Sequence, residues 1–123
     1  MNILLLMAAL LVLLVSVAHS YLGERYILTR LFRRADLPKL FGSDEFTRAT
    51  LRFAWHITSL AWLGLGSVIL VIGSVGPQAP MLAAIVSGTF AATGLVALVA
   101  SRGRHLSWVV FFAIAALVWS GRG

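Results

Sequence analysis

The sequence predicts an all-α integral membrane protein, a four-transmembrane-helix bundle in which helices 1 and 2 have helical extensions on the cytoplasmic side. Three observations lead to this class. Hydrophobic residues make up 60% of the 123-residue chain and charged residues only 11%, whereas soluble domains carry about 25% charged residues. The apolar residues fall into four runs, without the strict alternation of a barrel strand. The basic residues gather in two of the connections between those runs.

The first transmembrane helix is expected at about residues 2–22. Residues 3–18 contain no charge, and about 20 helical residues cross a hydrocarbon core of about 30 Å. Residues 18–20 also have the small-x-small pattern of a signal-peptidase site. However, the first two residues lack the basic charge of a signal peptide, and cleavage would leave seven basic residues outside. We therefore interpret this segment as a retained first helix.

A basic, amphipathic cytoplasmic connection is expected at about residues 23–51. Residues 21–34 contain no proline, so the first helix is predicted to continue past the membrane until Pro38, whose preceding residue disfavours helix. Ser43 and Asp44 then provide an N-cap and first-turn acidic charge, so the second helix is predicted to begin near residue 44. We expect the basic side chains to contact anionic lipid headgroups; the alternative is a solvated loop without a special partner.

The remaining spans are expected at about residues 52–75, 80–100 and 105–120. The last contains an apolar run of only 14 residues, 106–119. It crosses the membrane if flanking arginines reach the headgroups or if the bilayer thins locally. A single membrane domain, residues 1–123, follows.

Small residues repeat at intervals of four along the third predicted helix, at Ala84, Gly88 and Ala92. Small side chains at this spacing let helices approach closely in a bilayer. We therefore expect helix packing there, either inside the bundle or as an oligomer contact. A homo-oligomer or a larger membrane complex is the expected assembly.

The distribution of basic residues predicts the orientation. Nine of them lie in the first and third connections and one, Arg122, lies on the opposite side, because the turn at 76–80 is uncharged. The positive-inside rule then places both basic connections in the cytoplasm and both termini outside, in a cell inner membrane. Because the basic residues lie in short loops at a membrane surface, we expect the partner to be the lipid bilayer and no nucleic acid. The nine are Arg25, Arg30, Arg33, Arg34, Lys39, Arg48, Arg52, Arg102 and Arg104.

Two histidines define a candidate polar cluster at similar depth in the cytoplasmic leaflet. His56 shares a helical stripe with Ser59, and polar groups inside a membrane turn toward neighbouring helices. His19 shares a stripe with other polar residues of the first helix, so the two histidines are expected to face each other. A third histidine, His105, is expected at headgroup level. The predicted cluster comprises His19, His56, Ser16, Ser59, Tyr26 and Arg30.

Glu24 is expected to have a different role. It lies five residues after His19, about 140° around an ideal helix, and shares its face only if Gly23 loosens the turn. We therefore predict that Glu24 forms an ion pair with Arg48 or Arg52 on the second helix, which would tie the cytoplasmic extensions together.

Four hypotheses remain open for His19 and His56. They are structural hydrogen-bonding residues, ligands of a haem or divalent metal ion, proton-transfer or ion-pathway residues, or acid-base catalysts acting on a lipid-like substrate with help from Tyr26, Arg30 and Glu24. The chain contains no cysteine and no CxxCH or HExxH motif. The sequence thus predicts a non-catalytic accessory, assembly or transport-related membrane component without a cofactor. The alternative is a haem- or metal-binding membrane protein, or a small membrane enzyme, that uses the two histidines.

Overall fold

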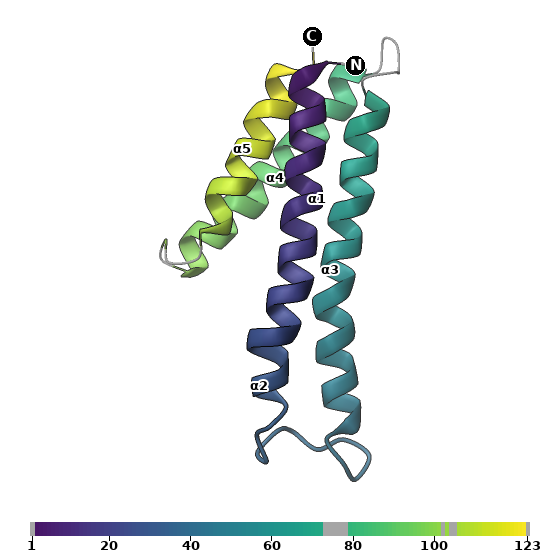
Figure 1. Cartoon of the computed structure of the whole chain (residues 1–123), viewed down its shortest axis with the longest axis vertical. Helices are drawn as coiled ribbons and strands as arrows, with labels where there is room; N and C mark the ends of the chain where they lie inside the picture. Colours follow the sequence, from purple (N-terminus) through teal and green to yellow (C-terminus); the bar gives the residue numbers. More distant parts are fainter. Residues whose placement is uncertain (1, 73–78, 102, 104–105, 123) are drawn as a thin grey trace. The chain divides into compact units, whose positions relative to one another are not determined.

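The computed structural model describes residues 2–72, 79–101, 103 and 106–122, with the side chains of residues 96, 100 and 101 excepted. All regular elements within these residues are helices (Figure 1), which confirms the predicted all-α class for this part of the chain. The predictions for residues 73–78, Arg102, Arg104 and His105 lie outside the described residues. The elements are α1 (Ile3–Leu22), the π-helix η1 (Gly23–Leu28), α2 (Thr29–Leu31), α3 (Glu45–Ile72), α4 (Ala79–Ser101) and α5 (Ser107–Ser120).

Three helical segments are long and apolar enough to cross a membrane: Ile3–Leu31, Glu45–Ile72 and Ala79–Val99. The first two contain 29 and 28 residues and are therefore about 42 to 44 Å long at 1.5 Å per residue. They exceed a hydrocarbon core of about 30 Å. The apolar helix α5 has 14 residues, a length of about 21 Å.

The chain divides into two compact units, and each is described here by itself. Unit 1 comprises Met1–Val15 and Leu63–Gly123, and unit 2 comprises Ser16–Trp62. The helices α1 and α3 each contribute to both units.

In unit 1, α4 and α5 run antiparallel and pack closely (Figure 1). Phe90 of α4 stacks on Phe111 of α5 with ring centroids 6.2 Å apart. Gly94 leaves room for Phe111 and its neighbour, because a Cβ there would approach them to 3.2–3.3 Å. The hydroxyl of buried Ser87 donates to the carbonyl oxygen of Ala115 at 2.8 Å. Aromatic packing, a small residue at the contact and the Ser87 hydrogen bond therefore all contribute to the pairing of these helices.

The predicted small-residue stripe of α4 lies outside this interface. Ala84 is half-buried, while Gly88 and Ala92 are exposed. Nothing lies within 4 Å of a Cβ built on Gly88. The face of α4 that packs on α5 carries Ser87 and Phe90 instead, so the stripe is available for a contact outside the chain.

The start of α1 packs beside the end of α5 in unit 1. Asn2 caps α1, since its Oδ1 accepts the N–H of Leu4 at 2.9 Å, and its side-chain amide donates to the carbonyl oxygen of Gly121 at 3.3 Å. Leu5 is buried, and a Cβ on Gly121 would meet its side chain at 3.0 Å. The glycine therefore permits a close approach.

In unit 2, the end of α1 with η1 and α2 runs antiparallel to the first half of α3 (Figure 1). We call the end of α1 with η1 and α2 the first limb, and the first half of α3 the second limb. The first limb ends at Leu31, before the stop that was predicted at Pro38. The second limb begins at Glu45, one residue after the predicted start, and the Glu45 N–H donates to Ser43 Oγ at 3.4 Å.

The connection between these limbs contains a tight turn. Leu40 and Ser43 exchange two backbone hydrogen bonds, and the residues between them, Phe41 and Gly42, both have positive φ angles of 57° and 89°. Such angles are costly for a bulky side chain and free for glycine. Phe41 is nevertheless 91% exposed, so the turn presents an aromatic ring at its tip.

The hydrogen bond between α4 and α5 predicts the effect of replacing Ser87 by alanine. The variant leaves the Ala115 carbonyl without that donor, so we expect the free energy of unfolding to fall by about 0.6 kcal/mol and by no more than about 1.7. Unfolding in detergent micelles would measure the loss. The control is Thr89→Ala, whose exposed hydroxyl donates to Ile85 in its own helix and whose loss should change little. Equal losses in the two variants would contradict this account.

Candidate functional site

Five polar side chains in unit 2 form a continuous hydrogen-bonded chain that joins α1 and η1 to α3. Glu24 Oε2 lies 3.0 Å from His56 Nε2, and His56 Nδ1 lies 3.0 Å from Ser20 Oγ. The Ser20 hydroxyl donates to Ser59 Oγ at 2.8 Å. Ser59 Oγ in turn lies 3.0 Å from His19 Nδ1. We call these five residues, from Glu24 to His19, the polar chain.

Burial varies along the polar chain. Ser59 is buried, and His19 and Ser20 are half-buried. The side chains of His56 and Glu24 are 36% and 38% exposed to solvent. The Glu24 end is therefore open to the surroundings, while the serines in the middle are largely enclosed.

Glu24 reaches His56 beside Ser20, which lies four residues earlier on the same helix face, and the π-helix η1 begins next to Glu24 at Gly23. The N–H of Thr29 bonds to the carbonyl oxygen of Glu24, five residues earlier, so each turn holds one residue more than in an α-helix and the rotation per residue is smaller. The predicted 140° between His19 and Glu24 assumed ideal α-helix throughout. The π-helix begins at Gly23. This is the residue at which the sequence analysis allowed for a wider turn.

Gly23 also allows a tryptophan to lie against the helix backbone. A Cβ at Gly23 would overlap the indole of Trp55. From this position, Trp55 Nε1–H donates to the carbonyl oxygen of His19 at 2.9 Å. The absence of a side chain at Gly23 is therefore required by the packing of α3.

The ring of His19 lies against two indoles. It stacks on Trp55 with centroids 4.7 Å apart and an interplanar angle of 4°. It meets Trp62 at 4.8 Å and 63°. These two ring contacts fix the orientation of the His19 imidazole between the indoles.

Glu24 is also tied to Arg52 of α3. The carboxylate lies 2.9 Å from Arg52 Nη2, and Arg52 Nε donates to it at 3.2 Å. Of the two arginines predicted as partners of Glu24, the structure pairs Arg52 with it. Arg48 instead pairs with Asp44 at 2.6 Å. Glu24 thus combines two roles that the sequence analysis separated, because it binds both Arg52 and His56.

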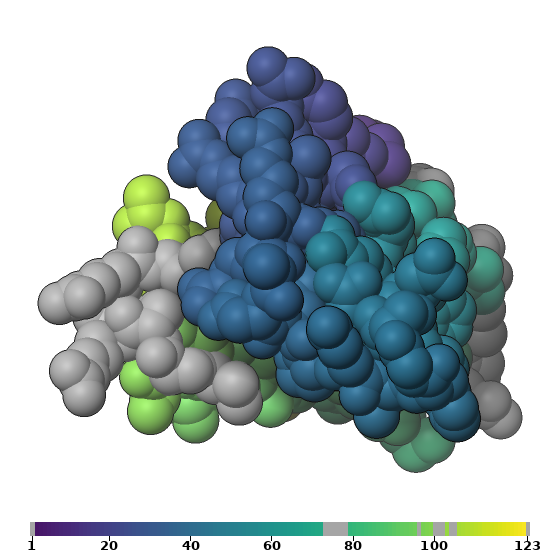
Figure 2. Space-filling view, turned by 90° about the horizontal axis from the view of Figure 1, so that it is seen from below, coloured from purple at the N-terminus to yellow at the C-terminus, as the bar shows by residue number. Residues whose placement is uncertain are grey.

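Further contacts order the connection between α2 and α3. Arg48 donates to the carbonyl oxygen of Phe32, and the Arg48 guanidinium holds the pKa of Asp44 below its usual value. Asp36 binds Arg34 at 2.6 Å, which lowers the pKa of Asp36 to about 2. Figure 2 views the protein from the end at which this connection lies, with its blue residues in the foreground.

Three of the predicted cluster residues lie elsewhere. Tyr26 and Arg30 are exposed and line an open groove on the outside of the first limb. The π-turn causes this change, since it rotates the residues after Gly23 away from the stripe expected for an unbroken α-helix. Ser16 is buried one turn before Ser20.

Both ring nitrogens of His56 and the Nδ1 of His19 are engaged in hydrogen bonds. A metal or haem iron at His56 would displace Ser20 or Glu24. Within the described residues, no group of three or more histidine, aspartate or glutamate side chains is arranged to hold a metal ion. The geometry therefore gives more support to hydrogen bonding than to ligation.

Ser20 and the two tryptophans are the site residues that sequence reasoning missed. Ser20 entered only as part of a cleavage pattern, and neither tryptophan was placed at the site. A signal was present, because Ser20 and Glu24 are four residues apart on one limb while His56 and Ser59 are three apart on the other. Such spacings place each pair on one helix face.

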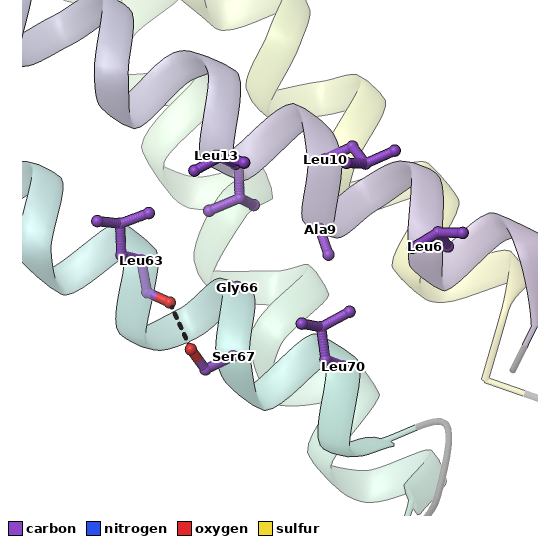
Figure 3. Close-up of a pocket in the computed structure, with 9 residues that line it drawn as sticks. Leu6, Ala9, Leu10, Leu13, Leu63, Gly66, Ser67 and Leu70 are labelled. Carbon is purple, nitrogen blue, oxygen red and sulfur yellow. Dashed lines mark hydrogen bonds between the residues drawn. The ribbon is translucent and has the colours of Figure 1, made fainter.

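Unit 1 contains a second hollow, an apolar pocket of about 250 Å³ between α1 and α3. Figure 3 shows leucine side chains from both helices around it, including Leu6, Leu13 and Leu70. The hydroxyl of Ser67 donates to the carbonyl oxygen of Leu63 in its own helix. The pocket therefore offers a space for apolar groups and no reactive side chain.

Comparison of the chain with models of protein families, with curated proteins and with solved structures found no match.

The close approach of Trp55 predicts that Gly23→Ala will disturb the polar chain. The new methyl group overlaps the indole, so the Trp55 bond to His19 and the ring stacking should be lost. We expect a red shift of tryptophan fluorescence and a fall of at least about 1 kcal/mol in unfolding free energy.

The control for this variant is Gly64→Ala, because nothing lies within 4 Å of a Cβ at Gly64. That change should leave the fluorescence unaltered and favours the helix by about 0.5–1 kcal/mol. A Gly23→Ala protein with the stability and emission of the wild type would show that the indole does not occupy this position.

Proposed function

We propose that this chain is a multi-pass protein of a cell inner membrane, with four transmembrane helices and both termini outside the cytoplasm. Three helices of sufficient length and apolarity support the membrane assignment. The fourth span is α5, whose length of about 21 Å requires anchoring at the interface. Arg122 lies 3.1 Å from the ring centroid of Trp119, and such residues anchor helices at headgroup level. The nine-to-one distribution of basic residues supports the orientation.

The connection between α2 and α3 is proposed to lie at the cytoplasmic membrane surface. The helical segments that lead to it exceed a hydrocarbon core by about 12 to 14 Å, more than the about 5 to 8 Å of one headgroup region, so the connection would lie at the aqueous boundary of the headgroups. Phe41, exposed at the tip of the turn, and the basic residues of the connection suit a surface of anionic lipids.

We also propose that the protein works as a homo-oligomer or within a larger membrane complex. The exposed stripe of Ala84, Gly88 and Ala92 on α4 supports this, because small residues at intervals of four permit close helix contacts in lipid. The described part of the chain leaves this stripe uncovered at Gly88 and Ala92.

Within that class, we infer a transport-related role in which the polar chain relays protons. One observation carries this inference: Glu24, His56, Ser20, Ser59 and His19 are joined without a break by contacts of 2.8–3.0 Å. Histidine is the side chain that changes charge near neutral pH. A serine hydroxyl both donates and accepts, so it can pass a proton between two imidazoles.

The same heavy atoms support two complete hydrogen-bond patterns. In the first, His56 is an imidazolium that donates to Glu24 and Ser20, Ser20 donates to Ser59, and Ser59 donates to His19. In the second, His19 is the imidazolium; it donates to Ser59, which donates to Ser20, which donates to the now bare His56 Nδ1. Three protons each move along one hydrogen bond, no bond between heavy atoms changes, and one positive charge passes from His56 to His19.

The two ends of the polar chain suit this transfer. At the open end, the carboxylate of Glu24 is held by Arg52 and stabilises the imidazolium of His56. At the other end, the face of Trp55 stacks on His19 and can accommodate a positive charge there. The charge therefore has a favourable partner in both positions.

Proton flux into lipid vesicles tests the relay. Vesicles containing the purified protein and a trapped pH-sensitive dye should acidify faster under a membrane potential than protein-free vesicles. Ser59→Ala removes the hydroxyl at the centre of the polar chain, and we expect flux to fall about 100-fold, the lower end of what a positioned proton-transfer group contributes.

Thr58→Ala is the matched control, because the adjacent Thr58 hydroxyl donates to Ala54 in its own helix at 3.0 Å. It should leave flux unchanged, and circular dichroism should show equal helix content in both variants. Flux equal to that of empty vesicles, or flux unaffected by Ser59→Ala, would refute the relay.

The proposed orientation is tested by reporter fusions. A phosphatase that is active only outside the cytoplasm should be active when it is fused after Arg122 and inactive when it is inserted after Gly42. The reverse pattern would place the basic connection outside and overturn the orientation.

A further inference from the structure

An open groove of about 580 Å³ runs along the outside of the first limb in unit 2. Its size lies within the range of about 300–1,000 Å³ that is usual for small-molecule sites. Glu24 forms its boundary toward the polar chain. The other lining residues are Tyr21, Arg25, Tyr26, Thr29, Arg30 and Arg33.

The three arginines of this groove take no part in the ion pairs found among the described residues. Those pairs use Arg34 with Asp36, Arg48 with Asp44, and Arg52 with Glu24. Arg25 contacts the ring of Tyr26 at 5.7 Å. The carboxylate of Glu24 is directed to Arg52 and His56, so no carboxylate in the described part of the chain forms an ion pair with these three arginines.

The π-turn gathers these residues on one side. Because η1 repeats after five residues at Glu24 and Thr29, side chains such as Tyr21, Tyr26 and Arg30 fall on one exposed strip. The hydroxyl of Thr29 donates to the Glu24 carbonyl oxygen, which fixes the middle of the strip. The groove is therefore a product of this turn.

The position along the helix indicates what the groove meets, on the proposed membrane location. If the core begins near Ile3 and spans about 20 residues, Arg25 to Arg33 lie about 4 to 16 Å beyond its edge. One headgroup region is about 5 to 8 Å deep, so Arg25 lies within it, and Arg30 and Arg33 lie on its aqueous side, from where their long side chains extend back to the phosphates. Tyr21 and Tyr26 are 61% and 49% exposed, and tyrosine places an apolar ring and a polar hydroxyl together at such an interface.

We propose that this groove binds the phosphate group of an anionic phospholipid. Arg30 and Arg33 bind the phosphate oxygens through charge-assisted hydrogen bonds, Arg25 adds positive charge, and the tyrosine rings contact the glycerol and the start of the acyl chains. The site rests on the proposed membrane location and adds a specific ligand class to it.

Two adjacent arginines provide the test. Full-length protein in detergent micelles is titrated with phosphatidylglycerol and with zwitterionic phosphatidylcholine, and bound lipid is counted by native mass spectrometry. The wild type should retain phosphatidylglycerol preferentially. Arg33→Gln should weaken that binding about fivefold. Arg34→Gln removes the same charge one residue away, outside the groove and from a pair with Asp36, and should change binding less than about twofold.

Equal losses in Arg33→Gln and Arg34→Gln would mean a general charge effect and would overturn the site, as would equal retention of the two lipids. Glycerol 3-phosphate in excess should not displace phosphatidylglycerol; if it does, the groove takes a soluble phosphate and the lipid assignment is wrong.

Ser59→Ala should bind lipid like the wild type. The binding assay requires neither proton flux nor a particular orientation, so its failure is distinct from failure of the relay or of the reporter test.

Discussion

The bonds that His56 makes to Glu24 and Ser20 are the interaction on which unit 2 depends. Polar groups among apolar helices have no water to bind and must find partners on a neighbouring helix. Within the described residues, no buried side-chain nitrogen or oxygen lacks a hydrogen-bond partner. Because His56 connects an exposed carboxylate to enclosed hydroxyls, it sets the spacing of the two limbs. Trp55 can then reach the His19 carbonyl oxygen, and Arg52 can reach Glu24.

The sequence predicted the helices well and the site only in part. Apolar runs and the Ser43 cap depend on local properties, so the helix that begins at Glu45 was placed within one residue. That His19, His56 and Ser59 lie near one another also followed from residue type and helical spacing. Ser20 and the contact of Glu24 with His56 were missed, although Ser20 and Glu24 lie four residues apart on one helix face, because the angle of Glu24 was judged only relative to His19. The π-helix that begins at Gly23 was not predicted, because no local residue pattern in this chain specifies it.

The α4 and α5 pair shows the same limit for helix packing. Many positions on α4 are small, so the sequence predicted close contact without deciding which face makes it. The choice falls on the face with Ser87 and Gly94, because Ser87 bonds to a carbonyl oxygen of α5 and Gly94 accommodates Phe111. Only the partner helix distinguishes that face from the stripe of Ala84, Gly88 and Ala92.

The π-helix makes the first limb sensitive to changes in its length. Because one turn holds an additional residue, the direction of each later side chain depends on the number of residues in the turn as well as on their identity. Loss of a single residue between Arg25 and Thr29 would return the backbone to ordinary α-helix, turn the arginines of the groove to a new direction and change the reach of the connection to α3. Substitutions at exposed positions there are tolerable, while changes in length are not. This short segment therefore works as a spacer of fixed length, which keeps the groove side of the limb and the side that packs on α3 in register.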